Sequence, residues 1–134
     1  MREFAKGRQR ILPALCLFYA IAGLAHIACP APFISITPGW VPFPTQTILA
    51  TGLCELAGAA GLALRQTRKS AAIGLSAYAA CVFPANINHA VDSLTASDAT
   101  LNAWLYHLPR LALQPVIVWL PLFACGLIAW PFRK

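Results

Sequence analysis

The sequence predicts an all-α protein, an integral membrane bundle of four transmembrane helices with the N- and C-termini in the cytoplasm. The first observation is composition: 59% of the 134 residues are hydrophobic and 10% are charged, and the mean hydropathy is +0.66. Soluble domains carry roughly 25% charged residues. The second observation is that basic residues fall in short clusters with long apolar spans between them. The third is that these clusters alternate with loops that carry no basic residue, as the positive-inside rule requires.

The net charge of +6 is concentrated at the chain ends and in one internal cluster. Basic residues crowd the first ten positions, residues 65–69 and the final pair, and Arg110 is the one basic residue elsewhere. These clusters place the N-terminus, the 65–69 loop and the C-terminus in the cytoplasm, and the 29–44 and 93–109 loops outside. Because no basic face or stacking platform is present, we expect a lipid bilayer and no nucleic acid as a partner.

Four apolar spans, approximately residues 11–28, 45–64, 70–92 and 110–131, form a single domain that covers residues 1–134. About 20 apolar residues cross a hydrocarbon core of about 30 Å, so each span predicts one membrane helix. Pro13 lies in the first turn of the first span, where proline is tolerated. A cleavable signal peptide is the alternative interpretation of that span, but its apolar run is long for one.

Two features distinguish the segments that follow. Five prolines between Cys29 and Pro44 predict an irregular loop, which we expect at the outer interface with Trp40 as an anchor. The second apolar span is rich in small residues at spacings of four, which allow helices to approach closely in membranes. These residues are Ala50, Cys54, Gly58, Ala57 and Gly61. In the outer segment 93–109, Trp104 and Tyr106 are expected at headgroup level.

The five cysteines are scattered and form no C-x-x-C pair, so we expect small packing residues and no disulfide framework. Cys29, near the outer surface, is the one candidate for thiol redox chemistry. We assign no metal site, because the sequence has no haem-ligand pair at matching depths and no iron–sulfur cysteine set. It has no flavin motif either.

Polar residues collect near the outer ends of the apolar spans. The third span ends in VFPANINHAVD, residues 82–92, and Pro84 within it frees the carbonyl of Ala80 as an acceptor. Glu55 lies about 15 Å from the outer end of the second span, close to mid-membrane. An ionisable group at that depth is costly unless it is paired or neutral, so Glu55 should face the bundle interior. We therefore predict an outer-side polar pocket lined by His26, Glu55, Asn86, His89, Arg110 and Gln114.

Each of these residues also has a simpler interpretation. The two histidines lie near helix ends, where interfacial hydrogen-bonding groups are common. Arg110 is long enough to snorkel to the outer phosphates, and the two amides are common inter-helix contacts. The sequence offers Glu55 four partners: His26, Asn86, Gln114 and Arg110.

Together these residues resemble the DoxX-like family of small four-helix bacterial membrane proteins, over about residues 15 to 125. The resemblance rests on Gly23-x-x-His26, PAPFISITPGWVPFP, Gly52-x-x-Glu55 followed by Gly58 and Gly61, Arg68, VFPAN, and Arg110-Leu-x-Leu-Gln114. Ala112 departs from the family pattern, which has proline there. The resemblance implies a multi-pass protein of the bacterial cytoplasmic (inner) membrane. It also implies a link to a quinol-oxidase or thiosulfate:quinone-oxidoreductase system.

The leading hypothesis is an accessory or quinone-interacting subunit of a membrane redox system, which is not an enzyme on its own and to which we assign no catalytic residue. Quinone is the one cofactor we consider. Arg110 and Gln114 would donate to a carbonyl oxygen, and Glu55 or a histidine would exchange protons. The partner would be a membrane oxidoreductase subunit or a second copy of the chain. Two alternatives remain: a non-enzymatic assembly protein that holds a partner helix, and a proton-coupled small-solute carrier that acts as an oligomer.

Overall fold

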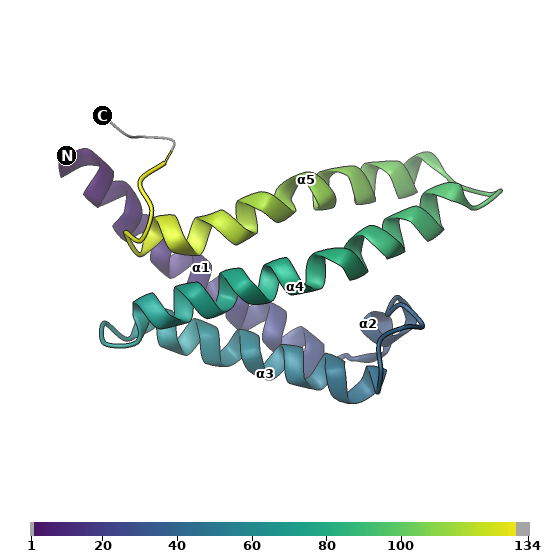
Figure 1. Ribbon diagram of the computed structural model, residues 1–134, viewed down its shortest axis with the longest axis horizontal. Coiled ribbons are helices and arrows are strands. Elements are labelled where there is room, and N and C mark those ends of the chain that lie inside the picture. Colours follow the sequence, from purple (N-terminus) through teal and green to yellow (C-terminus); the bar gives the residue numbers. More distant parts are fainter. Residues whose placement is uncertain (1, 131–134) are drawn as a thin grey trace.

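The computed structural model describes residues 2–130, and within that range it consists of helices without any strand (Figure 1). The elements are α1 (Arg2–Ala28), α2 (Ala31–Ser35), α3 (Pro44–Ala63), α4 (Arg68–Thr95) and α5 (Leu101–Ala124). The all-α prediction is therefore confirmed. The final basic pair, Arg133 and Lys134, lies outside the described residues.

Three of the described helices are long and apolar enough to cross a membrane, judged by length and composition. They are Arg10–Ala28 within α1, Pro44–Ala63, which is α3, and Arg68–Thr95, which is α4. α5 has 24 residues and is longer than α3. It carries Arg110, Gln114 and three internal prolines, however, and these residues interrupt its apolar sequence.

The start of α5 differs from the predicted boundary at residue 110. The helix begins at Leu101, where the Oγ1 of Thr100 accepts a hydrogen bond from the backbone N–H of Ala103 at 3.3 Å. A threonine at this capping position satisfies one of the free N–H groups of the first turn. The predicted 93–109 loop is therefore wrong: only a short turn separates Thr95 from Leu101, and the expected loop residue Trp104 lies on the helix.

The end of α5 also differs, because the helix stops at Ala124 and not at residue 131. Gly126 has a φ of +73°, and its N–H donates to the carbonyl of Phe123 at 3.0 Å. The N–H of Leu127 donates to the carbonyl of Leu122 at 2.9 Å. This is the Schellman pattern, in which a left-handed glycine ends a helix. The apolar residues that follow were therefore wrongly included in the fourth helix.

The long helices form two antiparallel pairs, α1 with α3 and α4 with α5, and α3 packs against α4 between them (Figure 1). The buried apolar cluster lies toward the end that holds the N-terminus and the α3–α4 turn. Its members are Leu15, Tyr19, Ala59, Leu62, Ala72, Leu75 and Ala124. Toward the other end, where α2 lies, the two pairs diverge (Figure 1).

The α3–α4 turn is held by side chains that satisfy the carbonyls at the end of α3. Arg68 donates from Nε to the carbonyl of Leu62 at 2.8 Å and from a terminal nitrogen to Ala63 at 3.1 Å. Thr67 donates to the carbonyl of Gly61 at 3.0 Å. A basic side chain at a helix C-terminus also favours the helix dipole. Arg68 therefore stabilises the end at which the two helix pairs meet.

Two of the small residues on α3 pack against α4 of the same chain. A Cβ at Gly58 would collide with Leu75, and a Cβ at Gly61 would lie 2.7 Å from the Cβ of Ala71. These two glycines therefore let α4 approach α3 closely. Ala50, Cys54 and Ala57 face outward.

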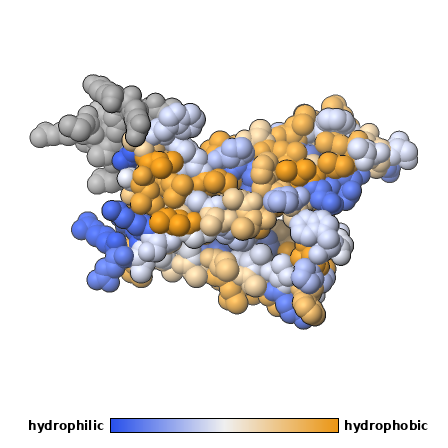
Figure 2. Space-filling view, in the orientation of Figure 1, coloured by the Kyte–Doolittle hydropathy of each residue, from blue (hydrophilic) through white to orange (hydrophobic). Residues whose placement is uncertain are grey.

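The outer surface of the helices is largely apolar, and hydrophilic groups gather at the α3–α4 turn (Figure 2). Many large apolar side chains are exposed along the helices, among them Leu17, Ile21, Leu24, Leu53, Ile73, Leu105 and Leu113. Soluble monomers rarely expose contiguous apolar patches of more than a few hundred Å². The surface therefore suits a hydrocarbon solvent.

Candidate functional site

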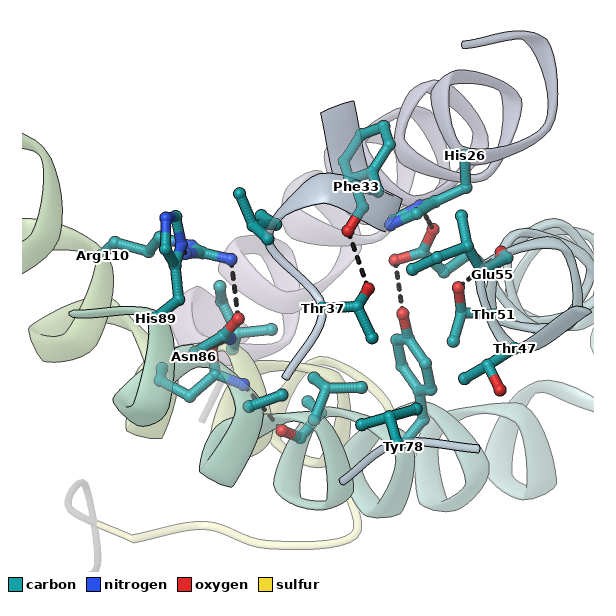
Figure 3. A pocket seen from close by; sticks show the side chains of 18 of the residues that line it. His26, Phe33, Thr37, Thr47, Thr51, Glu55, Tyr78, Asn86, His89 and Arg110 are labelled. Carbon is teal, nitrogen blue, oxygen red and sulfur yellow. Dashed lines mark hydrogen bonds and ion pairs between the residues drawn. The ribbon is translucent and has the colours of Figure 1, made fainter. Parts of the chain in front are cut away.

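A cavity of about 290 Å³ lies between the diverging helix pairs, next to α2 (Figure 3). All five helices contribute to its walls, and the segment after α2 contributes Ile36, Thr37, Pro38 and Val41. The six residues that we predicted for an outer-side pocket all line it: His26, Glu55, Asn86, His89, Arg110 and Gln114. Apolar side chains, among them Phe18, Phe33, Ile48, Val82 and Ile117, supply much of the remaining wall.

Glu55 lies on the α1–α3 side of the cavity, and both of its carboxylate oxygens are hydrogen bonded. His26 Nδ1 is 2.8 Å from Oε2, and the Tyr78 hydroxyl donates to Oε1 at 3.1 Å. His26 Nδ1 is also 2.9 Å from the carbonyl oxygen of Ala22. A ring nitrogen between two acceptors must carry the proton, so His26 donates and Glu55 accepts at both oxygens.

The sequence places these three groups together by simple spacing. His26 and Glu55 each follow a glycine by three residues, and the glycines, Gly23 and Gly52, lie where α1 and α3 pack closest. Residues three apart on a helix share a face, so the closest approach of the helices also brings His26 against Glu55. Tyr78 reaches the same carboxylate from α4.

The α4–α5 side of the cavity holds a chain of hydrogen bonds that begins at Arg110. Its guanidinium donates to Asn86 Oδ1 at 2.6 Å. The Asn86 amide donates to Gln114 Oε1 at 3.1 Å, and the Gln114 amide donates to the carbonyl of Ala79 at 2.6 Å. Gln114 is buried, with 4% of its surface exposed, and both ends of its amide are engaged. We therefore revise the expected role of Gln114: it positions Asn86 and Arg110.

His89 is the second contact of the Arg110 guanidinium. His89 Nδ1 lies 3.2 Å from a terminal nitrogen of Arg110, which can only donate, so Nδ1 is the acceptor and Nε2 carries the proton. The Tyr106 ring lies 5.6 Å from the guanidinium carbon, within cation–π range. Arg110 is thus held against the protein and lines the cavity, as the predicted pocket requires.

The polar groups therefore form two clusters and not one (Figure 3). The acidic cluster is His26, Glu55 and Tyr78, and the basic cluster is Asn86, His89, Arg110 and Gln114. Of the four partners considered for Glu55, the structure selects His26. Asn88 and Asp92, the other polar residues of VFPANINHAVD, bond to each other on the exposed side of α4 at 2.6 Å.

The two tyrosines that line the cavity, Tyr19 and Tyr78, were not predicted from the sequence. Tyr78 shares a face of α4 with Asn86 and His89, at spacings of eight and eleven residues, and Tyr19 lies two turns before His26 on α1. The helical period of about 3.6 residues could therefore have placed both tyrosines on the same helix faces as the predicted pocket residues. Tyr19 has 1% of its surface exposed, and its hydroxyl has no hydrogen-bond partner within residues 2–130.

Thiol and metal chemistry find no further support in the described part of the chain. All five cysteines are free, and Cys29 is exposed and lies outside the cavity lining. Among residues 2–130, no group of three or more His, Cys, Asp or Glu side chains is arranged to hold a metal ion.

A family model described as a domain of unknown function, DUF8561, matches residues 15–125, which include every residue of both polar clusters. No curated protein and no solved structure matches the chain.

Proposed function

This chain belongs to the DUF8561 family of domains of unknown function, and from that premise and the cavity we propose that it binds the headgroup of a quinone-like lipid within the membrane. The chain would act as an accessory or quinone-interacting subunit of a membrane redox system. It would not carry out electron transfer alone. The resemblance to the DoxX-like family and the assignment to the bacterial inner membrane belong to the same proposal.

The proposed membrane arrangement has four crossings, with α5 as the fourth and both chain ends in the cytoplasm. The basic cluster at 65–69 lies at the same end of the bundle as the N-terminus, and α2 lies at the other end (Figure 1). The polar side chains of α5 favour this arrangement, since Arg110 and Gln114 face the cavity while Leu105, Leu113 and Val116 are exposed. A helix with its polar groups inside and its apolar groups outside suits a membrane bundle.

The observation that carries the proposal is a cavity with a carboxylate on one wall and a guanidinium on the other. Placing ionisable groups at membrane depth costs free energy, so such groups in a membrane protein usually mark a functional site. The cavity volume of about 290 Å³ lies just below the roughly 300–1,000 Å³ that ligand sites occupy. A single ring with polar substituents fits such a volume, and an attached apolar tail would remain in the lipid between the diverging helix pairs.

The experiment is to purify the protein in mild detergent, extract it with organic solvent, and identify the bound quinone by mass spectrometry. We expect retained quinone near one molecule per chain, and less in Arg110→Leu protein of equal abundance. Protein that retains no quinone and that also fails to bind added duroquinone in nanodiscs would contradict the proposal.

A further inference from the structure

Arg110 is held in the cavity wall by neutral groups. Its Nη2 donates to Asn86 Oδ1 at 2.6 Å, and its Nη1 donates to His89 Nδ1 at 3.2 Å. A histidine nitrogen that accepts a hydrogen bond carries no proton, so the His89 ring is neutral. The Tyr106 ring lies 5.6 Å from the guanidinium carbon. These contacts orient the guanidinium and leave its positive charge without an opposite charge beside it.

The carboxylates that the structure describes are engaged elsewhere. A Glu55 oxygen lies 2.8 Å from His26 Nδ1, and Asp92 accepts a 2.6 Å hydrogen bond from a neighbouring asparagine on the exposed side of α4. Asp98 belongs to the turn between α4 and α5. Among the side chains that the structure describes, none forms an ion pair with Arg110.

Arg110 also lies deep in the bundle in the proposed arrangement of four crossings. At about 1.5 Å per residue it is about 14 Å along α5 from Leu101, the first residue of the helix. Charged side chains at such a depth usually pair with an opposite charge, because an unpaired charge away from water is costly. A negatively charged group on a ligand in the cavity supplies this partner.

The guanidinium of Arg110 has donors left for such a group. It carries five N–H groups, of which two reach Asn86 and His89. Arg110 lines the cavity, and Figure 3 shows its guanidinium directed from the α4–α5 side toward the opposite wall. A guanidinium binds two neighbouring oxygens of an anion through paired N–H groups. This donor set therefore suits an anion that presents two adjacent oxygens.

The rest of the lining favours a flat ring over a lipid phosphate. Apart from the two polar clusters it is largely apolar and includes the rings of Phe18 and Phe33. A phosphate group carries its charge on several strong acceptor oxygens, which several donors usually bind together. Of the described residues that line the cavity, Arg110 is the only arginine or lysine. A ring that delocalises one negative charge suits a single cation between apolar walls.

We infer, on the basis of the proposed function, that the quinone headgroup bound in this cavity is an ionised hydroxyquinone, with Arg110 as its counter-ion. A hydroxyquinone is a vinylogous carboxylic acid, so its hydroxyl loses its proton readily and the negative charge is delocalised into the ring. The ionised oxygen and the adjacent carbonyl oxygen accept from two N–H groups of Arg110. The Glu55 carboxylate stays bonded to His26 and Tyr78 on the opposite wall, and these donors offset its negative charge there.

The test compares two analogues of duroquinone in which one methyl group is replaced, by a hydroxyl in one and by a methoxy group in the other. At neutral pH the hydroxy analogue is an anion, whereas the methoxy analogue has a similar size and no charge. Binding is measured on protein in phosphatidylcholine nanodiscs, with empty nanodiscs to correct for partitioning into lipid. We expect the wild-type protein to bind the hydroxy analogue at least about tenfold more tightly, because a hydrogen bond to an ionised oxygen is roughly twice as strong as one between neutral groups.

Two substitutions test whether Arg110 is the counter-ion. Arg110→Gln keeps an amide donor but removes the charge, so it should bring the ratio of the two affinities close to one. Arg65→Gln is the matched control, because Arg65 is exposed in the α3–α4 turn and its loss changes the net charge of the protein equally. That variant should keep the wild-type ratio. A preference for the hydroxy analogue that survives Arg110→Gln, or that Arg65→Gln also removes, would overturn the inference.

The outcomes separate this inference from the proposed function. Equal or tighter binding of the methoxy analogue by the wild-type protein would overturn the inference while leaving a quinone-binding function intact. Failure of both analogues and of duroquinone to bind would overturn the function itself. Loss of both analogues in nanodiscs that contain phosphatidylglycerol would show that a lipid phosphate occupies the cavity, and would also overturn the inference. Should Arg110→Gln protein fail to accumulate, Arg110→Lys decides: it keeps the charge but loses the paired N–H groups, so the ratio should fall, and an unchanged ratio would overturn the inference.

Discussion

Gly23 and Gly52 lie face to face at the crossing of α1 and α3. A Cβ on Gly23 would lie 2.7 Å from the carbonyl oxygen of Gly52, and a Cβ on Gly52 would lie 2.9 Å from that of Gly23. Real Cβ atoms essentially never approach a backbone atom so closely, so the helices must part if either glycine acquires a side chain. His26 and Glu55, each three residues further along its helix, are joined by a 2.8 Å contact that depends on this approach.

Gly52→Ala should therefore separate α1 from α3 and break the contact between His26 and Glu55. We expect the free energy of unfolding to fall by about 1–3 kcal/mol, the usual effect of overpacking, measured by thermal unfolding in detergent. Gly74→Ala is the matched control, since Gly74 lies within α4 with nothing within 4 Å of an added Cβ. That change should be neutral or stabilising by up to about 1 kcal/mol. Equal effects of the two substitutions would contradict the role assigned to Gly52.

Two substitutions of Glu55 separate the contribution of its hydrogen bonds to stability from the contribution of its titratable proton to function. Glu55→Leu leaves the Tyr78 hydroxyl without its acceptor and leaves His26 Nδ1 with the Ala22 carbonyl alone, which should lower the stability by about 1–3 kcal/mol and reduce abundance in the membrane. Glu55→Gln keeps the shape and one acceptor, so the protein should still accumulate. If Glu55 exchanges protons with the ligand, the Gln variant should lose function at normal abundance. Full function of the Gln variant would limit Glu55 to a structural role.

The interior position of Glu55 could be predicted from the sequence, because an ionisable side chain near the middle of a membrane helix is costly when it faces lipid. The partners of Glu55 did not follow, since pairing depends on which helices pack together. Tyr78 was overlooked because a tyrosine in an apolar helix has the composition of a core or interface residue. The start of α5 was missed because residues 93–109, which carry no lysine or arginine, were taken as an outer loop, whereas the helix begins at Leu101 and contains Pro109.

Topology can be tested by fusing a reporter that is active only in the cytoplasm. Fusions at residue 67 should give signal, and fusions after Thr37 or Asp98 should not, because the lysines and arginines cluster on one side. Residue 67 lies in the α3–α4 turn, whereas Thr37 and Asp98 lie between helices at the opposite end. Signal at both outer positions would rule out four crossings with cytoplasmic ends.

Cys29→Ser should leave abundance and quinone binding unchanged. The thiol is free and exposed, and it does not line the cavity. Quantitative immunoblotting and the duroquinone assay measure the two quantities. Loss of binding at normal abundance would instead assign Cys29 a thiol role in the site.

Gln114 offers the sharpest test of how Arg110 is positioned. Gln114 Nε2 donates to the carbonyl of Ala79, and Gln114 Oε1 accepts from Asn86, whose own oxygen accepts from Arg110. Gln114→Met has a similar length and no amide, so it frees Asn86 to rotate and leaves the Arg110 guanidinium less constrained. We expect duroquinone affinity to fall by about tenfold, because a misplaced Arg110 loses about one hydrogen bond to the ligand.

The control for this change is Asn102→Ala, which removes an exposed amide from the same helix and should leave the affinity unchanged. A purely structural role of Gln114 would lower thermal stability without changing the affinity of the protein that remains folded. Stability and affinity must therefore be measured on the same preparation. Rescue of binding by Gln114→Glu at low pH, where a protonated carboxyl again offers one donor and one acceptor, would show that the hydrogen bonds to Ala79 and Asn86 set the position of Arg110. Failure of that rescue in folded protein would assign the loss of affinity to packing around residue 114.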